Sequence, residues 1–333
     1  MFLGHENDLE EGEWKVLSHT PDPRILVKNK GKFYQISNLC PHQGSLIRQG
    51  CGKGDDAVCP YHAWSWDLDG NPISSGTTKD FSNESPLERK QVYRWKGFLF
   101  DEHPLGRRSF FFDERPLGRK KSSLPRISSD ELLRTKDLEL VDQRVDLVRA
   151  SYINIMDLFL DLEHIPVVHP GLYDEINIPD IDDVEWDYFE NGSVQLAPFR
   201  ENTGSPDWNA HTIKDDLKSG YGAIWVALYP GTVIEWQPGA YFIMENVPSL
   251  SDKDETDVHV WKYRDTKYSD KNWEINSKVW EKAWEQDVAQ SELMRSTWYL
   301  NEKKNMYEKS KVHFRDWLKE NDRLKGSSLE KKV

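Results

Sequence analysis

Two short segments combine cysteine and histidine at a spacing that suits a metal centre. The first is Cys40-Pro-His42, and the second, after sixteen intervening residues, is Cys59-Pro-Tyr-His62. Two thiolates and two imidazoles form the ligand set of a [2Fe–2S] centre in which the imidazoles bind one iron and the thiolates the other. A tetrahedral zinc site uses the same side chains, and spacing alone does not separate the two. Both segments stand in predicted strand–turn loops, unlike the hairpin and helix of a zinc finger, so we favour the [2Fe–2S] cluster.

A second group of polar residues lies in an otherwise apolar stretch of the chain. Asn154, Asp157, Asp161 and His164 follow one another at steps of three, four and three residues, which puts them on one stripe of a helix. Buried carboxylates and imidazoles are costly unless they are paired or bind a metal. His169 adds a second imidazole after a proline that we expect to end the helix.

Two histidines and one carboxylate leave three positions open at Fe(II), which is the arrangement of Fe(II) oxygenases. A buried polar network without a metal is the alternative for this stretch taken alone. The cysteine–histidine loops upstream favour the iron site.

The motifs resemble those of the Rieske oxygenases. Residues 40–44 read Cys-Pro-His-Gln-Gly and residues 59–64 read Cys-Pro-Tyr-His-Ala-Trp, as in the oxygenase and ferredoxin branch of Rieske proteins, although Ala63 stands where that branch usually has glycine. Asp161-x2-His164-x4-His169 resembles the catalytic motif of the same family. The resemblance implies that both histidines bind Fe(II). It also implies that Asp161 hydrogen-bonds one of them and reaches His62 of a neighbouring subunit as an electron bridge.

The third iron ligand and the pocket residues are expected further along the chain. The segment at 285–292 resembles the family's acidic helix and puts Asp287 at the ligand position, with Glu285 and Glu292 as alternatives. Asp157 stands where the family often has asparagine, and we place it near the iron. His211 and His259 could belong to the substrate pocket. We expect Cys51 to have no role in the metal sites.

Patterning predicts an α+β protein of two domains. Residues 1–120 are expected to form an all-β Rieske domain with a connector, which begins near residue 101, and residues 121–333 a catalytic domain of the helix-grip type. In the second domain we expect a helix from Ser151 to Glu163, an antiparallel sheet, and a long polar helical region from Asp270 to Asn321. The predicted strands are Arg24–Lys28, Lys32–Ile36, Gly97–Phe100, Gln143–Arg149, Ala223–Tyr229, Val233–Gln237, Tyr241–Asn246 and Asp257–Arg264.

Composition narrows the class of partner. The 333 residues carry a formal net charge of −13, which argues against nucleic acid because phosphate binding needs clustered Lys and Arg. We find no apolar run long enough for a membrane helix and no secretion signal, and we expect a cytoplasmic protein. Three cysteines in such a chain do not indicate a disulfide framework.

These observations predict the terminal oxygenase of a Rieske system, which hydroxylates or oxidatively demethylates a small organic substrate with O2. The sequence has no glycine-rich dinucleotide motif, so electrons from NAD(P)H must arrive through a separate reductase or ferredoxin. The resemblance implies a homotrimer. A pure electron-transfer protein and a catalytically silent relative of the oxygenases are the alternatives.

The cluster assignment predicts a spectroscopic signature. Reduced protein should give an electron paramagnetic resonance signal of the Rieske type, with a potential of about −150 mV or higher, because imidazole ligation raises the potential. The substitution His62→Cys should abolish that signature. Stoichiometric zinc without iron in anaerobically prepared protein would contradict the assignment.

Overall fold

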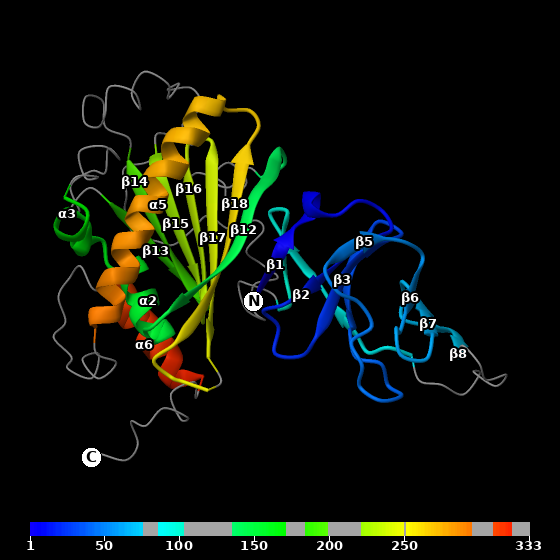
Figure 1. The fold of residues 1–333 in the computed structure, drawn as a ribbon. Helices are drawn as coiled ribbons and strands as arrows, with labels where there is room; N and C mark the ends of the chain where they lie inside the picture. Colours follow the sequence, from blue (N-terminus) through cyan, green and yellow to red (C-terminus); the bar gives the residue numbers. More distant parts are fainter. Residues whose placement is uncertain are drawn as a thin grey trace, which may run out of the picture. The chain divides into compact units, whose positions relative to one another are not determined.

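The computed structural model describes residues 1–75, 86–102, 135–170, 184–198, 221–249, 251–294 and 309–321. The chain divides into two units, Met1–His103 and Pro104–Val333 (Figure 1). The predicted boundary after residue 120 and most of the predicted connector lie outside the described residues. None of the helices in the described ranges combines the length and the apolar character needed to cross a membrane.

The first unit is built from short antiparallel strands, as the sequence predicts. Three sheets have the orders β1-β11-β10, β5-β2-β3-β4-β9 and β6-β7-β8. The strands are β1 (Phe2–His5), β2 (Glu13–Leu17), β3 (Arg24–Asn29), β4 (Lys32–Ser37), β5 (Cys51–Lys53), β6 (Asp56–Val58), β7 (Trp64–Asp67), β8 (Pro72–Ser75), β9 (Arg89–Gln91), β10 (Tyr93–Trp95) and β11 (Phe98–Phe100), with a short 3-10 helix, η1 (Glu6–Asp8).

One apolar cluster of this unit lies directly behind the cysteines. Cys40 and Cys59 are buried together with Trp66, Ile36 and Ile47. Removing these side chains from water stabilises the unit by roughly 1.5–3 kcal/mol for each large apolar group. The same packing fixes the starting points of both cysteine–histidine loops.

The second unit contains one seven-stranded antiparallel sheet, which confirms the predicted α+β class. Its strand order is β12-β18-β17-β16-β15-β14-β13. The strands are β12 (Leu138–Val148), β13 (Glu185–Phe189), β14 (Gly192–Pro198), β15 (Tyr221–Leu228), β16 (Thr232–Gln237), β17 (Ala240–Pro248) and β18 (Thr256–Asp265). The prolines and glycines at 230–231 and 238–239 form the turns on either side of β16, as predicted.

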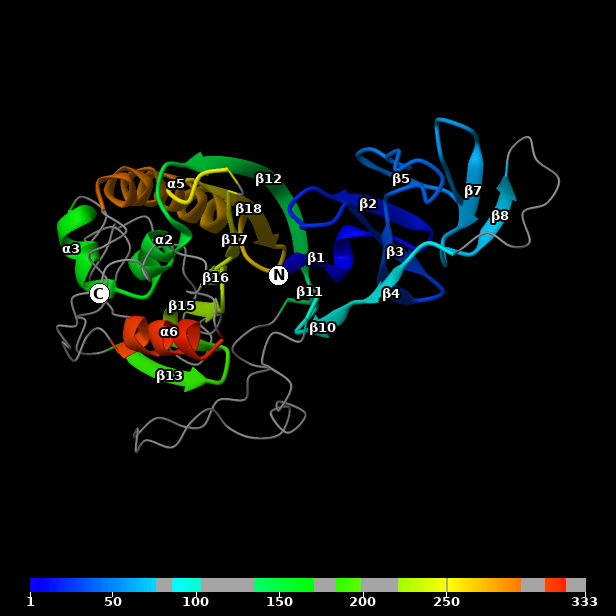
Figure 2. The same ribbon diagram turned by 90° about the horizontal axis from the view of Figure 1, so that it is seen from below.

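The helices in the described part of this unit lie on one face of the sheet (Figure 2). They are α2 (Tyr152–Phe159), η3 (Leu162–His164), α3 (Ile165–Val168), α5 (Asp270–Leu293) and α6 (Lys309–Glu320). Along α5, Trp280 and Trp284 pack with Phe242 of β17 in a single core. Trp280 stacks on Phe242 with ring centroids 4.8 Å apart. This packing sets the rotation of α5 about its axis, and so decides which of its polar residues point inward.

The predicted helix from Ser151 to Glu163 is wrong in its extent. Ser151 caps α2 by accepting a hydrogen bond from Asn154 N, but α2 ends at Phe159. Asp161 has extended backbone angles and caps the short helix η3. Pro166 lies in the first turn of α3, where its missing N–H costs nothing, so it helps to start a helix and does not end one. The polar stripe is thus carried by two short helices in succession, α2 and η3, and His169 follows α3.

Candidate metal centres

The two cysteine–histidine loops of the first unit share one backbone geometry. In each loop the cysteine carbonyl accepts a hydrogen bond from the residue four positions later, and the cysteine N–H donates to the carbonyl five positions later. The four bonds are Gly44 N to Cys40 O (2.8 Å), Ala63 N to Cys59 O (3.0 Å), Cys40 N to Ser45 O (2.8 Å) and Cys59 N to Trp64 O (2.7 Å). The two loops therefore have the same main-chain hydrogen bonds. They differ in the position of the histidine, which follows the cysteine by two residues in the first loop and by three residues in the second.

The fourth position after each cysteine has a left-handed backbone conformation. The φ angle is 71° at Gly44 and 58° at Ala63. That conformation costs a residue with a Cβ roughly 1–2 kcal/mol, whereas glycine adopts it freely. The departure from the family pattern at Ala63 thus keeps the shape of the loop at some cost in free energy.

The four ligand side chains divide into a buried and an exposed pair. Cys40 and Cys59 are buried, and His42 and His62 are exposed, with ring centroids 4.6 Å apart. The ring of His42 also stacks on Trp64. A cluster held by these groups would have its sulfur ligands in the core and its imidazole ligands at the surface, where electrons can leave.

Main-chain N–H groups point at both sulfurs. Burial raises the pKa of the Cys40 thiol. Burial acts in the same direction on Cys59, but N–H groups of Tyr61 and His62 donate to its sulfur and bring its pKa below the ordinary value. Donors aimed at thiolates are what a [2Fe–2S] cluster requires, and they help to set its potential. The residues fit the cluster.

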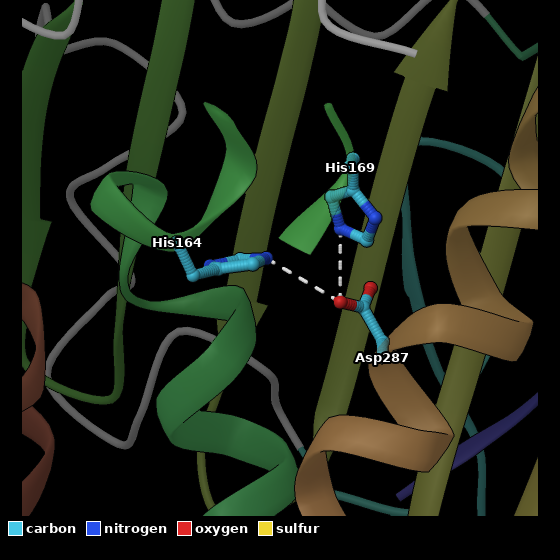
Figure 3. A group of neighbouring side chains, drawn as sticks. All are labelled: His164, His169 and Asp287. Carbon is cyan, nitrogen blue, oxygen red and sulfur yellow. Dashed lines mark ion pairs between the residues drawn. The ribbon is translucent and has the colours of Figure 1, made fainter. Parts of the chain in front are cut away.

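In the second unit the side chains of His164, His169 and Asp287 converge on one point (Figure 3). These three residues are called the triad. Their ligand atoms lie within 4.8 Å of one another. Asp287 Oδ1 is 3.0 Å from His169 Nε2 and 3.4 Å from His164 Nε2. Oδ1 is buried and accepts no hydrogen bond. The sequence predicted this grouping from residues more than a hundred positions apart.

The hydrogen-bond partner of Nδ1 in each imidazole determines which ring nitrogen carries a proton. His169 Nδ1 lies 2.8 Å from the amide oxygen Oε1 of Gln286, and His164 Nδ1 contacts the main-chain carbonyl oxygen of Asp161. Both partners are acceptors, so each Nδ1 must carry the proton. Each Nε2 then presents a lone pair toward Asp287, and three acceptors face one another without a donor. A proton on one Nε2 or a metal ion between the three groups satisfies them, and two imidazoles with a carboxylate fit Fe(II) with open positions.

The electrostatics of the three groups agree with a cation site. Burial alone would raise the pKa of Asp287, but the neighbouring imidazoles outweigh it and lower the pKa. Burial alone would lower the pKa of His169, but Asp287 outweighs it and raises the pKa. Both shifts mean that the site stabilises positive charge between these side chains.

Of the three acidic candidates on α5, only Asp287 turns inward. Trp280, Trp284 and Asp287 are buried on the same face of the helix. Glu285 and Glu292 are exposed, and Glu292 accepts a hydrogen bond from Arg149 N. The packing of the two tryptophans therefore selects the ligand candidate.

Asp161 contacts His164 differently from the expectation. Its main-chain carbonyl, and not its carboxylate, receives the imidazole N–H. One carboxylate oxygen accepts from Glu163 N, and the other pairs with Lys311 Nζ of α6 at 2.7 Å. The side chain keeps 20% of its surface exposed. The reason is the extended backbone at Asp161, which turns its carbonyl toward the ring.

Asp157 takes part in a buried ion pair and is not among the converging groups. Its Oδ2 lies 2.7 Å from Arg315 Nη2 of α6. Burial raises the pKa of Asp157, with Arg315 acting in the opposite direction. Asn154, one turn earlier, donates to the carbonyl of Met294 at 3.4 Å. Asp157 and Asn154 therefore belong to a buried polar network that needs no metal, which was the alternative for this stretch of sequence.

Of the two remaining histidine candidates, the structure describes only His259. It is buried on β18 and is not among the described residues that line the cavity beside the triad. His211 lies outside the described residues.

Sequence reasoning missed Glu235 of β16. It lines the cavity together with the triad and is buried. Its oxygens accept hydrogen bonds from Gln237 Nε2 (2.6 Å) and Trp280 Nε1 (3.1 Å). An acidic residue inside the apolar run of residues 232–236 was the available signal.

Comparisons with known proteins agree with both halves of the structure. A family model for the Rieske [2Fe-2S] domain matches residues 1–84. The putrescine 2-hydroxylase of Ralstonia nicotianae is 24% identical over 250 residues, which cover 70% of this chain and 62% of that protein. The carnitine monooxygenase oxygenase subunit of Escherichia coli is 27% identical over 163 residues, 46% of this chain and 41% of that subunit. The chain thus matches less than two thirds of the length of either relative.

Solved structures extend the likeness across both units. A quaternary ammonium Rieske monooxygenase in complex with L-carnitine has a TM-score of 0.69 at 15% identity, covering 96% of this chain and 88% of its own. Residues 1–84 thus match the Rieske [2Fe-2S] domain, and the chain as a whole has the fold of the Rieske oxygenases. Naphthalene 1,2-dioxygenase from a Rhodococcus species, also at 15% identity, has a TM-score of 0.65, covering 95% of this chain and 77% of its own. This family fold accounts for the all-β first unit and the helix-on-sheet second unit.

The triad and the two cysteine–histidine loops together predict about three irons per chain, two in the cluster and one mononuclear. His169→Ala and Asp287→Ala should each remove the third iron and leave the cluster spectrum intact, although Asp287→Ala keeps two imidazoles and should retain weak binding. The measurement is iron content together with the cluster absorbance. Glu285→Ala, on the exposed face of the same helix, is the matched control. Full iron in Asp287→Ala with a loss in Glu285→Ala would show that the wrong acid had been assigned.

Proposed function

We propose that the chain is a terminal oxygenase that uses O2 to hydroxylate or oxidatively demethylate a small organic substrate. The observation that carries the proposal is the convergence of His164, His169 and Asp287 at the wall of a cavity. The Rieske domain of the same chain supports it. So do the relatives named as acting on putrescine and carnitine, which are both small organic molecules.

The chain's own residues have distinct tasks in this function. Cys40, His42, Cys59 and His62 would hold the cluster, and the triad would hold Fe(II). When bound, these groups supply electrons and the activation of dioxygen. Gln286 and the carbonyl of Asp161 orient the two imidazoles, which keeps both lone pairs on the metal side. The apolar walls next to the triad, including Leu158 and Ile165, limit the access of water.

The surface around the cluster loops supports a partner that receives or delivers electrons. Several large apolar side chains next to the ligands are exposed to solvent. They are Leu39 (38%), Leu46 (43%), Val58 (42%) and Tyr61 (62%). Apolar groups gathered around a redox centre are typical of a docking surface. A separate reductase or ferredoxin and a neighbouring copy of this chain in a homotrimer belong to this proposal, as does a cytoplasmic location.

The proposal predicts oxygen consumption that depends on substrate. Pre-reduced, iron-replete protein should take up O2 and reoxidise its cluster with a suitable small organic compound, and should form an oxidised product. His164→Ala should abolish the product and retain the reducible cluster. Reduction and reoxidation of the cluster without product across a broad panel would favour a pure electron carrier or a silent relative.

The electron bridge predicts a kinetic defect in Asp161→Asn. If the Asp161 carboxylate connects His164 with His62 of a neighbouring subunit, this variant should load both metals and yet slow cluster reoxidation by orders of magnitude in a single turnover. Because the substitution also breaks the ion pair with Lys311, Lys311→Met is the control, since it removes the pair and keeps the carboxylate. Wild-type rates in metal-replete Asp161→Asn would refute the bridge, and equal defects in both variants would assign the effect to the ion pair.

A further inference from the structure

The cavity beside the triad has aromatic walls. Trp225 of β15, Trp280 and Trp284 of α5, and Phe159 of α2 all line it. The space between the lining side chains, part of which is open to solvent, amounts to about 580 Å³. Indole rings are the best of the side chains at attracting a cation through their faces.

Four buried or partly buried carboxylates lie in this part of the second unit, and they differ in their compensating charge. Asp157 is paired with Arg315, and Asp161 with Lys311. Asp287 faces two imidazoles and the candidate metal position. Each of these three carboxylates has a cationic partner or belongs to a cation site.

Glu235 is the exception. The donors to its oxygens are neutral. Among the described residues that line the cavity there is no lysine or arginine. The nearby cations Lys262 and Arg144 lie over the ring of Trp280 and pair with Glu281. Glu235 acts electrostatically on His169 of the triad, but its hydrogen-bond donors are all neutral and no described lysine or arginine pairs with it. A buried carboxyl of this kind that faces a cavity has little compensation for its charge.

We propose that the cavity takes an alkylammonium substrate, with Glu235 as the counter-ion of its positive group and the tryptophans as its walls. This inference rests on the proposed function, because it names the substrate class of the same site. The three donors to Glu235 are Gln237, Trp280 and Trp225, and all are neutral. A carboxylate has about four acceptor sites, so it can accept a further contact. The fixed hydrogen bonds hold the carboxyl in place, so little order has to be created when a ligand binds.

The environment of Glu235 agrees with this role. Burial raises the pKa of Glu235 to about 7. A cation in the cavity favours the ionised form and offsets the cost of burial. An anionic substrate would meet Glu235 without any described lining lysine or arginine to attract it.

The test compares isosteric ligands that differ in charge. Choline and 3,3-dimethylbutan-1-ol have the same shape, and putrescine and butane-1,4-diol form a second pair. Binding is measured by calorimetry without O2, on full-length protein carrying its cluster and Fe(II). At least one cation should bind about tenfold or more tightly than its neutral counterpart, a ratio within the span of measured effects of desolvated charge pairs.

Two variants separate the counter-ion from other effects. Glu235→Gln keeps the size of the side chain and should reduce the preference for the cation to about threefold or less. Glu245→Gln makes the same change at a buried glutamate of β17 that does not line the cavity, and should keep the preference. Neutral isosteres that bind as well as the cations, no binding of either cation, or an unchanged preference in Glu235→Gln would each overturn the inference.

The comparison of wild-type ligand pairs needs no variant, so it decides the question even if Glu235→Gln fails to fold. Selective binding of cations without O2 uptake would leave the inference standing and remove the proposed function. O2 uptake coupled to a neutral or anionic compound, with no binding of cations, would do the reverse.

Discussion

Three acceptor atoms that face one point without a donor are the constraint around which the second unit is arranged. His164 Nε2, His169 Nε2 and Asp287 Oδ1 would repel one another unless a proton or a metal ion lay between them. Keeping them there requires both imidazoles to be held from behind, which Gln286 and the carbonyl of Asp161 do. It also requires a break after α2, because a continuous helix would have used that carbonyl for its own hydrogen bonds. The broken helix is therefore a consequence of the site.

Much of this could be predicted from the sequence, because chemistry and periodicity are local signals. The cysteine–histidine spacing predicted the two loops that carry the candidate cluster ligands. Alternating or continuous apolar runs predicted β3, β4, β11 and β15–β18 within two residues, whereas β12 begins five residues before the predicted strand. The extent of α2 could not be read in the same way. A helical stripe and a succession of short helices place polar residues at similar steps, and the choice depends on partners in α5 and α6, more than a hundred residues away.

Glu235 shows a second limit of sequence reasoning. On a strand with one solvated face, an acidic residue between apolar neighbours points to water. Strand β16 is buried on both faces, with sheet neighbours on either side and helices above it, so the same pattern places the carboxyl in the interior. Trp280 of α5 and Gln237 then satisfy its oxygens. Only the packing of a distant helix on the sheet distinguishes the two outcomes.

The buried carboxylates of this unit fall into two groups, those paired with a cationic side chain of the chain itself and those without such a partner. The first group stabilises the fold, and we assign the second group to ligand binding. Breaking an ion pair such as Asp157–Arg315 leaves a buried charge alone and typically costs about 3–5 kcal/mol, so that pair serves to hold α6 against α2. A buried carboxylate without a cationic partner in the chain destabilises the ligand-free protein. A cationic ligand that binds beside it removes this free-energy cost of burial. By this argument Asp287 is matched to a metal and Glu235 to a cationic substrate, and the same rule of charge compensation that stabilises the fold also selects what enters the cavity.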